Sequence, residues 1–110
     1  MREALLCQNL ASGCGRRFTV QLKIDTGMTR LGCNWEDGER LTDAILQLDQ
    51  LHLRAVYSHL ALADGELDGD AERITRMQQE RFEAVTRAHR AQGLERHLAN
   101  SAGTLRHASL

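Results

Sequence analysis

The sequence predicts an α/β fold in which helices pack against a parallel sheet. Stretches with the apolar pattern of β-strands are separated by stretches with the periodicity of amphipathic helices. The predicted strands cover residues 20–25, 53–60 and 96–102, and the predicted helices cover residues 3–11, 36–50 and 71–92. Strands and helices that alternate in this order usually form right-handed βαβ units, which place the strands parallel in one sheet.

The first predicted strand is the most informative stretch of the chain. Apolar and polar side chains alternate from Val20 to Asp25, so one face of the strand is apolar and the other carries Lys23 and Asp25. Gly27 then ends the strand in a turn, because glycine adopts backbone angles that other residues avoid. The polar face indicates a functional interior, such as the mouth of a (β/α) barrel. A hairpin strand with one solvated face is the alternative.

The predicted helices bury one face each, and the spacing of their apolar residues defines that face. The residues expected on these faces are Ala4, Leu5, Leu6 and Leu10 in the first helix, Leu41, Ala44, Ile45 and Leu48 in the second, and Ile74, Met77, Phe82, Val85 and Ala88 in the third. Gln78 lies next to the stripe of the third helix. Residues 101–106 are expected to begin a further helix.

Composition argues against several classes of protein. The chain has 110 residues and a formal net charge of −1, so no excess of positive charge favours nucleic acid or an anionic membrane. No apolar run has the length of a membrane span, and the first residues lack the apolar core of a signal peptide. The 3 cysteines have no metal-ligand spacing, so we expect free thiols, a cytoplasmic location and no metal site.

Polar residues follow the end of each predicted strand. They are Lys23, Asp25 and Arg30 after the first strand, His59 after the second, and Asn100 and Ser101 after the third. In a parallel sheet these strand ends lie along one edge, and ligands of α/β proteins bind outside that edge. We therefore expect these side chains to form one site.

Four blocks of the sequence resemble the bacterial alanine racemases. Residues 22–32 (LKIDTGMTRLG) are similar to the family's signature K-x-D-T-G-M-x-R-L/I-G. Residues 57–64 (YSHLALAD) resemble its second block, with an H-x-A-x-A-D core, and residues 97–103 (HLANSAG) resemble its third. Gln78 and Phe82 have the family's Gln-x-x-x-Phe spacing. The blocks occur in the family's order across nearly the whole chain.

The resemblance implies an enzyme that uses pyridoxal 5'-phosphate to interconvert L-alanine and D-alanine for cell-wall peptidoglycan. Such enzymes are homodimers with an amino-terminal (β/α)8 TIM barrel that binds the cofactor, and a carboxy-terminal β-domain. Residues 1–110 are then expected to be a fragment of the barrel domain, about three βα units with parallel strands, without the β-domain. A serine or broad-specificity amino-acid racemase fragment and a non-catalytic α/β module that binds a phosphate ligand are the alternatives.

The resemblance also implies roles for the residues at the strand ends. Lys23 would be carbamylated and hold Arg30, and Arg30 would reach the phenolic oxygen of the cofactor and the carboxylate of the substrate. His59 would lie beside the pyridine ring. Ser101, with neighbouring backbone amides, would bind the phosphate, and Asn100 would help to shape that pocket. The residue types suit an anionic ligand, because guanidinium and exposed N–H groups bind phosphate and carboxylate.

Each of these roles has a simpler alternative. Lys23 without a carbamate could pair with Asp25, and His59 could be a packing residue at the end of a strand. Ser101 could cap a helix, which uses the same exposed backbone amides.

The family's two catalytic residues are expected to lie outside this chain. The lysine that forms the Schiff base with the cofactor belongs upstream of the block around Lys23, and the catalytic tyrosine belongs to the partner's carboxy-terminal domain. Lys23 is the only lysine in the sequence and occupies the position of a different lysine of the family. The chain alone is therefore expected to be inactive.

Overall fold

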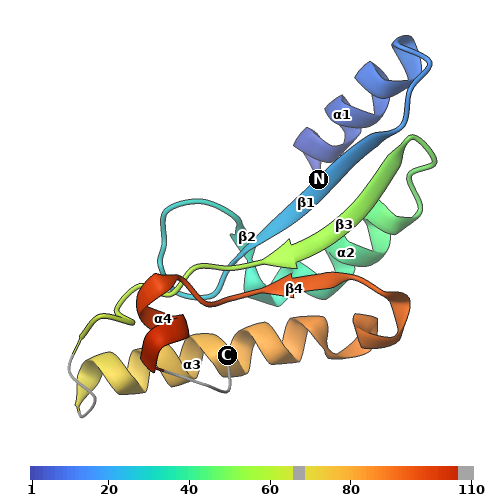
Figure 1. Ribbon diagram of the computed structural model, residues 1–110. Coiled ribbons are helices and arrows are strands. Elements are labelled where there is room, and N and C mark those ends of the chain that lie inside the picture. Colours follow the sequence, from blue (N-terminus) through green and yellow to red (C-terminus); the bar gives the residue numbers. More distant parts are fainter. Residues whose placement is uncertain (66–68, 107–110) are drawn as a thin grey trace.

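The computed structural model describes residues 1–65 and 69–106. Its helices are α1 (Arg2–Gly13), α2 (Gly38–Leu46), α3 (Asp70–Thr86) and α4 (Ser101–Arg106), with 3₁₀ turns η1 (Trp35–Asp37) and η2 (Arg87–Gln92). The strands are β1 (Phe18–Asp25), β2 (Cys33–Asn34), β3 (Leu51–Tyr57) and β4 (Glu95–His97). They form one sheet in the order β2-β1-β3-β4, with every pair parallel (Figure 1). The predicted α/β class and parallel sheet are confirmed.

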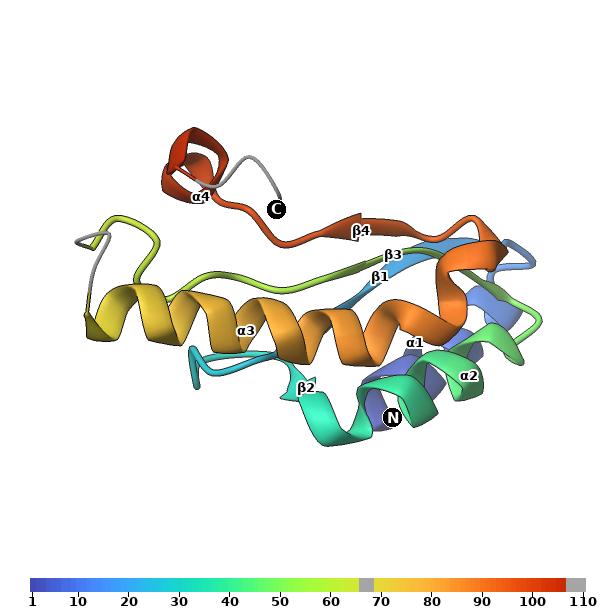
Figure 2. The ribbon, with the colours of Figure 1, turned by 90° about the horizontal axis from the view of Figure 1, so that it is seen from below.

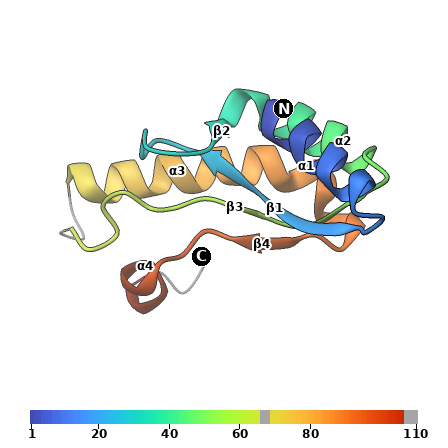
Figure 3. The same ribbon diagram turned by 90° about the horizontal axis from the view of Figure 1, so that it is seen from above.

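The helices lie on the two sides of the sheet unequally. α1, α2 and α3 lie on one side, and α4 lies on the other side, beyond the carboxyl end of β4 (Figures 2 and 3). Both views agree that no helix among the described residues covers the middle of that second face. A sheet with this arrangement presents polar side chains on its open face.

The core lies between the sheet and α2 and α3. Ile24 of β1 and Val56 of β3 point to this side and belong to one buried cluster with Ile45 of α2 and with Phe82 and Val85 of α3. Gly38, the first residue of α2, approaches so closely that an added Cβ would lie 2.6 Å from Val85 Cγ1 and 3.1 Å from Ile24 Cδ1. Close contact of this kind requires glycine at the start of α2.

A β-bulge changes which side chains of β3 point to each face of the sheet. Val20 pairs with Leu53, but Gln21 pairs with Ala55, so Arg54 is an extra residue on β3. Beyond the bulge, Val56 points to the helices and Tyr57 points to the open face, level with its partner Lys23.

The face of α1 that meets the sheet is not the predicted one. Ala11 is buried, while Leu5, Leu6 and Leu10 are exposed by 46%, 59% and 54%. α1 contacts the core through the small side chains of Ala4 and Cys7, and Gln8 Oε1 accepts a hydrogen bond from Gln50 N at 3.0 Å. Small residues allow the helix to approach the strand, so the leucines turn outward.

The other predicted elements differ mainly at their ends. The predicted helix 71–92 is α3 followed by the 3₁₀ turn η2, where Ala88 is exposed and His89 is buried instead. Thr86 Oγ1 donates a hydrogen bond back to Phe82 O at 2.8 Å, and such bonds weaken the regular helix. The predicted helix 36–50 ends at Leu46, and the predicted strand 96–102 is a short strand followed by α4. β2, with 2 residues, was not predicted.

An ion-pair cluster joins β4 to α3. Arg96 of β4 donates hydrogen bonds to Glu83 and, at 2.9 Å, to Thr86 Oγ1, and its guanidinium lies 5.8 Å from the centre of the Phe82 ring. Arg90 donates to the same carboxylate. Partial burial raises the pKa of Glu83, but the hydrogen bonds and charges of Arg96 and Arg90 outweigh it and hold the pKa below 4.5.

We expect Gly38→Ala to destabilise the chain. The new methyl group would overlap Val85, a β-branched residue with little freedom to move, and overpacking of a core typically costs about 1–3 kcal/mol. Gly13→Ala is the matched control, because its Cβ meets no atom within 4 Å and alanine favours the helix by about 1 kcal/mol. Thermal unfolding followed by circular dichroism checks both changes. Equal or higher Tm for Gly38→Ala would contradict the packing described.

The Glu83 cluster predicts a pH-dependent stability difference. The folded state favours the carboxylate of Glu83, so its contribution is present at pH 7 and is lost as the pH falls through the lowered pKa, below 4.5. The wild-type chain should therefore unfold at a higher temperature than Glu83→Gln at pH 7, and the difference should shrink toward pH 3. Glu80→Gln, an exposed position on the same helix, is the control. A difference that does not shrink at all as the pH falls below the ordinary pKa of a glutamate would show that the cluster is not its cause.

Candidate functional site

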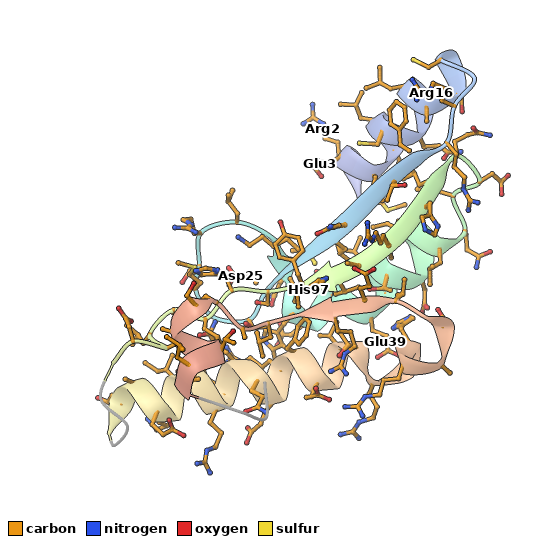
Figure 4. All side chains as sticks on the ribbon, viewed as in Figure 1. Arg2, Glu3, Arg16, Asp25, Glu39 and His97 are labelled. Carbon is orange, nitrogen blue, oxygen red and sulfur yellow. The ribbon has the colours of Figure 1, made fainter. Side chains whose placement is uncertain are left out.

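Three strand ends bring a row of polar side chains to the open face of the sheet. Lys23 of β1 pairs with Tyr57 of β3, and Tyr57 pairs with His97 of β4. Residues paired across parallel strands point to the same side, so the three side chains form one row. Lys23 Nζ lies 5.9 Å from the centre of the Tyr57 ring, within the range of a cation–π contact. Asp25 and His97, the last residues of β1 and β4, mark this edge in Figure 4.

The carboxylate of Asp25, the last residue of β1, stabilises the turn that follows this strand. Asp25 Oδ1 accepts hydrogen bonds from the backbone N–H groups of Gly27 and Thr29, both at 3.0 Å. Partial burial raises the pKa of Asp25, but the N–H groups of Thr29, Gly27 and Met28 and the charge of Lys23 together hold it below 3.8. Within the described ranges no ion pair joins Lys23 to Asp25. The carboxylate is instead committed to the turn.

The same turn closes tightly onto β1. Thr29 has a φ of +57°, which is uncommon for a residue other than glycine. Gly32 has a φ of +122°, and an added Cβ would lie 2.9 Å from Asp25 N and 3.0 Å from Lys23 O. The chain therefore returns against the end of β1 before β2 begins, and Arg30 is an exposed residue of this loop.

A buried hydrogen-bond network joins the ends of β1 and β3 to α3. Gln78 Nε2 donates to Thr26 Oγ1 at 3.1 Å and to His59 O at 3.0 Å, and Gln78 Oε1 accepts from Ala61 N at 2.9 Å. Thr26 Oγ1 also shares a hydrogen bond of 2.8 Å with Ser58 Oγ. Gln78 and Thr26 are 0% exposed. The network fixes the segments after β1 and β3 relative to each other.

Arg81, which follows Gln78 on the same face of α3, also contacts the turn after β1. Its Nη1 donates to Thr26 O at 2.9 Å, and its guanidinium lies 5.3 Å from the centre of the Trp35 ring. An added Cβ at Gly27 would lie 3.4 Å from Arg81 Nη1. Gln78 and Arg81 therefore both bind Thr26, one at its side chain and the other at its carbonyl.

The segment after β4 is attached to the segment after β3 by Asn100. Its Nδ2 donates to Leu60 O at 3.3 Å, and its Oδ1 accepts from Gly103 N at 2.8 Å. Asn100 thus caps α4, so the capping alternative for Ser101 is wrong. Ser101 begins α4 with an exposed side chain, and His59 is half-buried.

The predicted site residues share this edge but are not all in contact. Lys23, His59 and Ser101 lie at or after the carboxyl ends of β1, β3 and β4, along the same edge of the sheet. Arg30 makes no hydrogen bond or ion pair with any residue in the described part of the chain, and nothing joins it to Lys23 there. The edge therefore carries two cations and a hydroxyl, with one nearby carboxylate already occupied.

Part of this arrangement could not be predicted from the sequence. Tyr57 lies in the block of residues 57–64, but only its pairing with Lys23 shows that it belongs to the row. The spacing of Gln78 and Phe82 indicates a family and does not predict the contacts of Gln78. A glutamine beside an apolar helix stripe was the one available signal for the buried network, while Arg81 and Ser58 had none.

Two further kinds of site are absent from the described residues. No cluster of three or more His, Cys, Asp and Glu side chains there could hold a metal ion. No helix in residues 1–65 or 69–106 combines the length and apolar character needed to cross a bilayer.

Comparisons with known proteins agree on one family. The model of the family described as "Alanine racemase, N-terminal domain" matches residues 1–110. An alanine racemase of Prochlorococcus marinus is 50% identical over 107 residues, which are 96% of this chain and 28% of that protein. The chain thus spans just over a quarter of the length of this relative.

Solved structures give the same result. An alanine racemase of Clostridium difficile 630 superposes with a TM-score of 0.84 at 25% identity, over 99% of this chain and 28% of that one. An alanine racemase of Streptomyces coelicolor A3(2) superposes with a TM-score of 0.75 at 30% identity, over 96% and 28%. The parallel sheet and its helices correspond to part of the TIM barrel of these enzymes. The chain belongs to the family of alanine racemase N-terminal domains.

Proposed function

We propose that this chain forms part of the cofactor-binding barrel of an alanine racemase that interconverts L-alanine and D-alanine for peptidoglycan synthesis. One observation carries the proposal: the strand ends that bear the family's motif residues lie along one edge of one parallel sheet. As in that family, we expect a cytoplasmic homodimer whose substrate is a small amino acid. The barrel domain would include residues 1–110, and the carboxy-terminal β-domain would be a separate part of the enzyme.

The residues at this edge fit pyridoxal 5'-phosphate. The ligand is an anion with an aromatic ring, and the edge offers the cation Arg30, the Ser101 hydroxyl and the His59 imidazole. Asp25, the carboxylate that would repel it, already accepts two backbone hydrogen bonds. When bound, the cofactor withdraws electrons from the α-carbon of an amino acid, which makes its proton removable.

Each side chain then has a separate task. Ser101 would bind the phosphate, in a pocket that Asn100 shapes by tying α4 to Leu60. His59 would orient the ring from one side. Arg30 would bind the phenolic oxygen of the cofactor and the carboxylate of the substrate, because its planar guanidinium can donate two hydrogen bonds at once.

Lys23 would neutralise Arg30 through a carbamate. Two cations close together at this edge would repel each other by a few kcal/mol at an effective dielectric constant of about 20. Asp25 interacts with the charge of Lys23, but its Oδ1 is directed to the amides of Gly27 and Thr29, and it forms no ion pair with Arg30 among the described residues. The Lys23 ammonium first loses one proton, and addition of carbon dioxide to the resulting neutral amine releases a second proton, so that an anionic carbamate would replace a cation.

The proposal predicts that this sequence can replace the matching segment of a racemase. Exchanged for the 107 matched residues of the relative that is 50% identical, it should support alanine racemization within about tenfold of the parent rate, a change of 1.4 kcal/mol in barrier. Arg30→Ala in the hybrid should lower kcat/KM by a further factor of about 100 or more. Arg87→Ala, at an exposed arginine of η2, is the control. An inactive but folded hybrid would argue against the proposed function.

The chain alone should form no covalent adduct with the cofactor at Lys23. Lys23 is the only lysine, and the proposal gives it the carbamate role and not that of the Schiff-base lysine. Incubation with pyridoxal 5'-phosphate, borohydride reduction and peptide mass mapping provide the measurement. A stoichiometric adduct at Lys23 would contradict the assignment.

Substitution of Lys23 tests the carbamate. In the hybrid racemase, Lys23→Ala should lower kcat by about tenfold or more, since Arg30 would lose an anionic partner. A small added carboxylate should restore part of the rate. Lys23→Arg should not substitute, because a guanidinium does not form a carbamate. Full activity of Lys23→Arg would eliminate the carbamate and leave Asp25 as the partner of Arg30.

A further inference from the structure

We propose that Gln78 is a positioning residue of this site: its buried amide sets the turn that carries Arg30 relative to the strand end that carries His59. We call the hydrogen bonds of the Gln78 side-chain amide the clamp. The contacts of the clamp are observed directly, and its role for Arg30 and His59 rests on the proposed function. Gln78 belongs to α3, on the helix side of the sheet, and is 0% exposed. It therefore acts through other residues.

The amide of Gln78 uses both of its N–H donors and its oxygen. One N–H reaches Thr26 Oγ1 at 3.1 Å, immediately after β1, and the other reaches His59 O at 3.0 Å, two residues after β3. The oxygen accepts Ala61 N at 2.9 Å. A single side chain thus satisfies two chain segments that lie more than thirty residues apart in the sequence.

The orientation of this amide is determined by its partners. A carbonyl such as His59 O can only accept, and a backbone N–H such as that of Ala61 can only donate. If the amide were rotated by half a turn, its oxygen would face His59 O and its N–H₂ would face Ala61 N. Both contacts would be repulsive, so Gln78 permits one arrangement of the two segments.

Burial makes the hydrogen bonds of Gln78 important for stability. Burial of an amide costs free energy unless its hydrogen bonds are made. Removal of one partner leaves the remaining buried donor or acceptor without a hydrogen bond. Thr26 is also held by Ser58 Oγ at 2.8 Å and, through its carbonyl, by Arg81 at 2.9 Å. The residue that begins the turn is therefore fixed at its side chain and at its backbone.

The turn passes this restraint on to Arg30. Asp25 joins Gly27 and Thr29, so the backbone from Thr26 to Thr29 forms a compact unit next to Arg30. Arg30 itself has no hydrogen bond or ion pair within the described residues. Its backbone position depends on this unit, and the unit depends on Thr26.

Amide hydrogen exchange of the 110-residue chain tests the clamp. Gln78→Met keeps the side-chain volume and removes the three hydrogen bonds. We expect the Ala61 amide to exchange about tenfold faster or more, with smaller increases at Gly27 and Thr29, relative to the β-ladder amides of Leu22 and Val56. Gln79→Met, the same change at the next position, is the control, because the Gln79 amide makes no hydrogen bond in the described residues.

The ratio of local to ladder exchange decides the outcome. Unchanged exchange at Ala61, or an increase that is equal at Val56, would overturn the proposal, since the first shows no clamp and the second shows general destabilisation. If Gln78→Met fails to fold, Thr26→Val takes its place: it removes only the hydroxyl, and the amides of Gly27 and Thr29 should lose protection without a change at Val56.

The hybrid racemase gives the functional readout. Gln78→Met should lower kcat by about tenfold while KM for alanine changes by less than about threefold, because misplaced groups lose alignment in the transition state more than binding in the ground state. Faster local exchange with unchanged kcat would reduce Gln78 to a structural residue and overturn its positioning role. An inactive hybrid with wild-type Gln78 would count against the proposed function, while the exchange experiment would still decide the clamp.

Discussion

The parallel pairing of β1, β3 and β4 is the constraint on which the rest of this structure depends. It places Lys23, Tyr57 and His97 at one level and brings the following segments to a common edge. Parallel pairing requires a crossover between each pair of strands, and α2 and α3 serve as these crossovers. The helices that make the pairing possible also bury Ile24 and Val56, so one arrangement produces both the core and the site.

The parallel sheet and the edge that bears the site could be predicted because each rests on a local pattern. Alternation from Val20 to Asp25 and the helical stripe of Leu41 and Ile45 depend on neighbours in sequence, and both are confirmed by the structure. The motif around Lys23 could be compared directly with a family. Its chemical role could not be read in this way and remains a proposal.

The contacts of Gln78 and the orientation of α1 could not be predicted, because both depend on distant parts of the chain. Gln78 satisfies Thr26 and Ala61, which belong to other elements, and a polar residue beside an apolar stripe is usually solvated. Periodicity predicts a buried face that includes Leu6, yet the small residues of α1 make the closer contact with the sheet. Periodicity identifies an amphipathic face but not which neighbour it meets.

The β-bulge at Arg54 affects how this strand tolerates changes in length. In a strictly alternating strand, Leu51, Leu53 and Tyr57 would share one face, and the tyrosine ring would enter the core. The extra residue reverses the order, so the leucines pack against helices while Tyr57 lies beside Lys23. Deletion of that one residue would restore simple alternation and keep both faces, and one more inserted residue would do the same, because either change makes the separation of Leu53 and Tyr57 odd. At the present length the separation is even, so the bulge, and not the chemical type of the residues, places Tyr57 on the open side of the sheet.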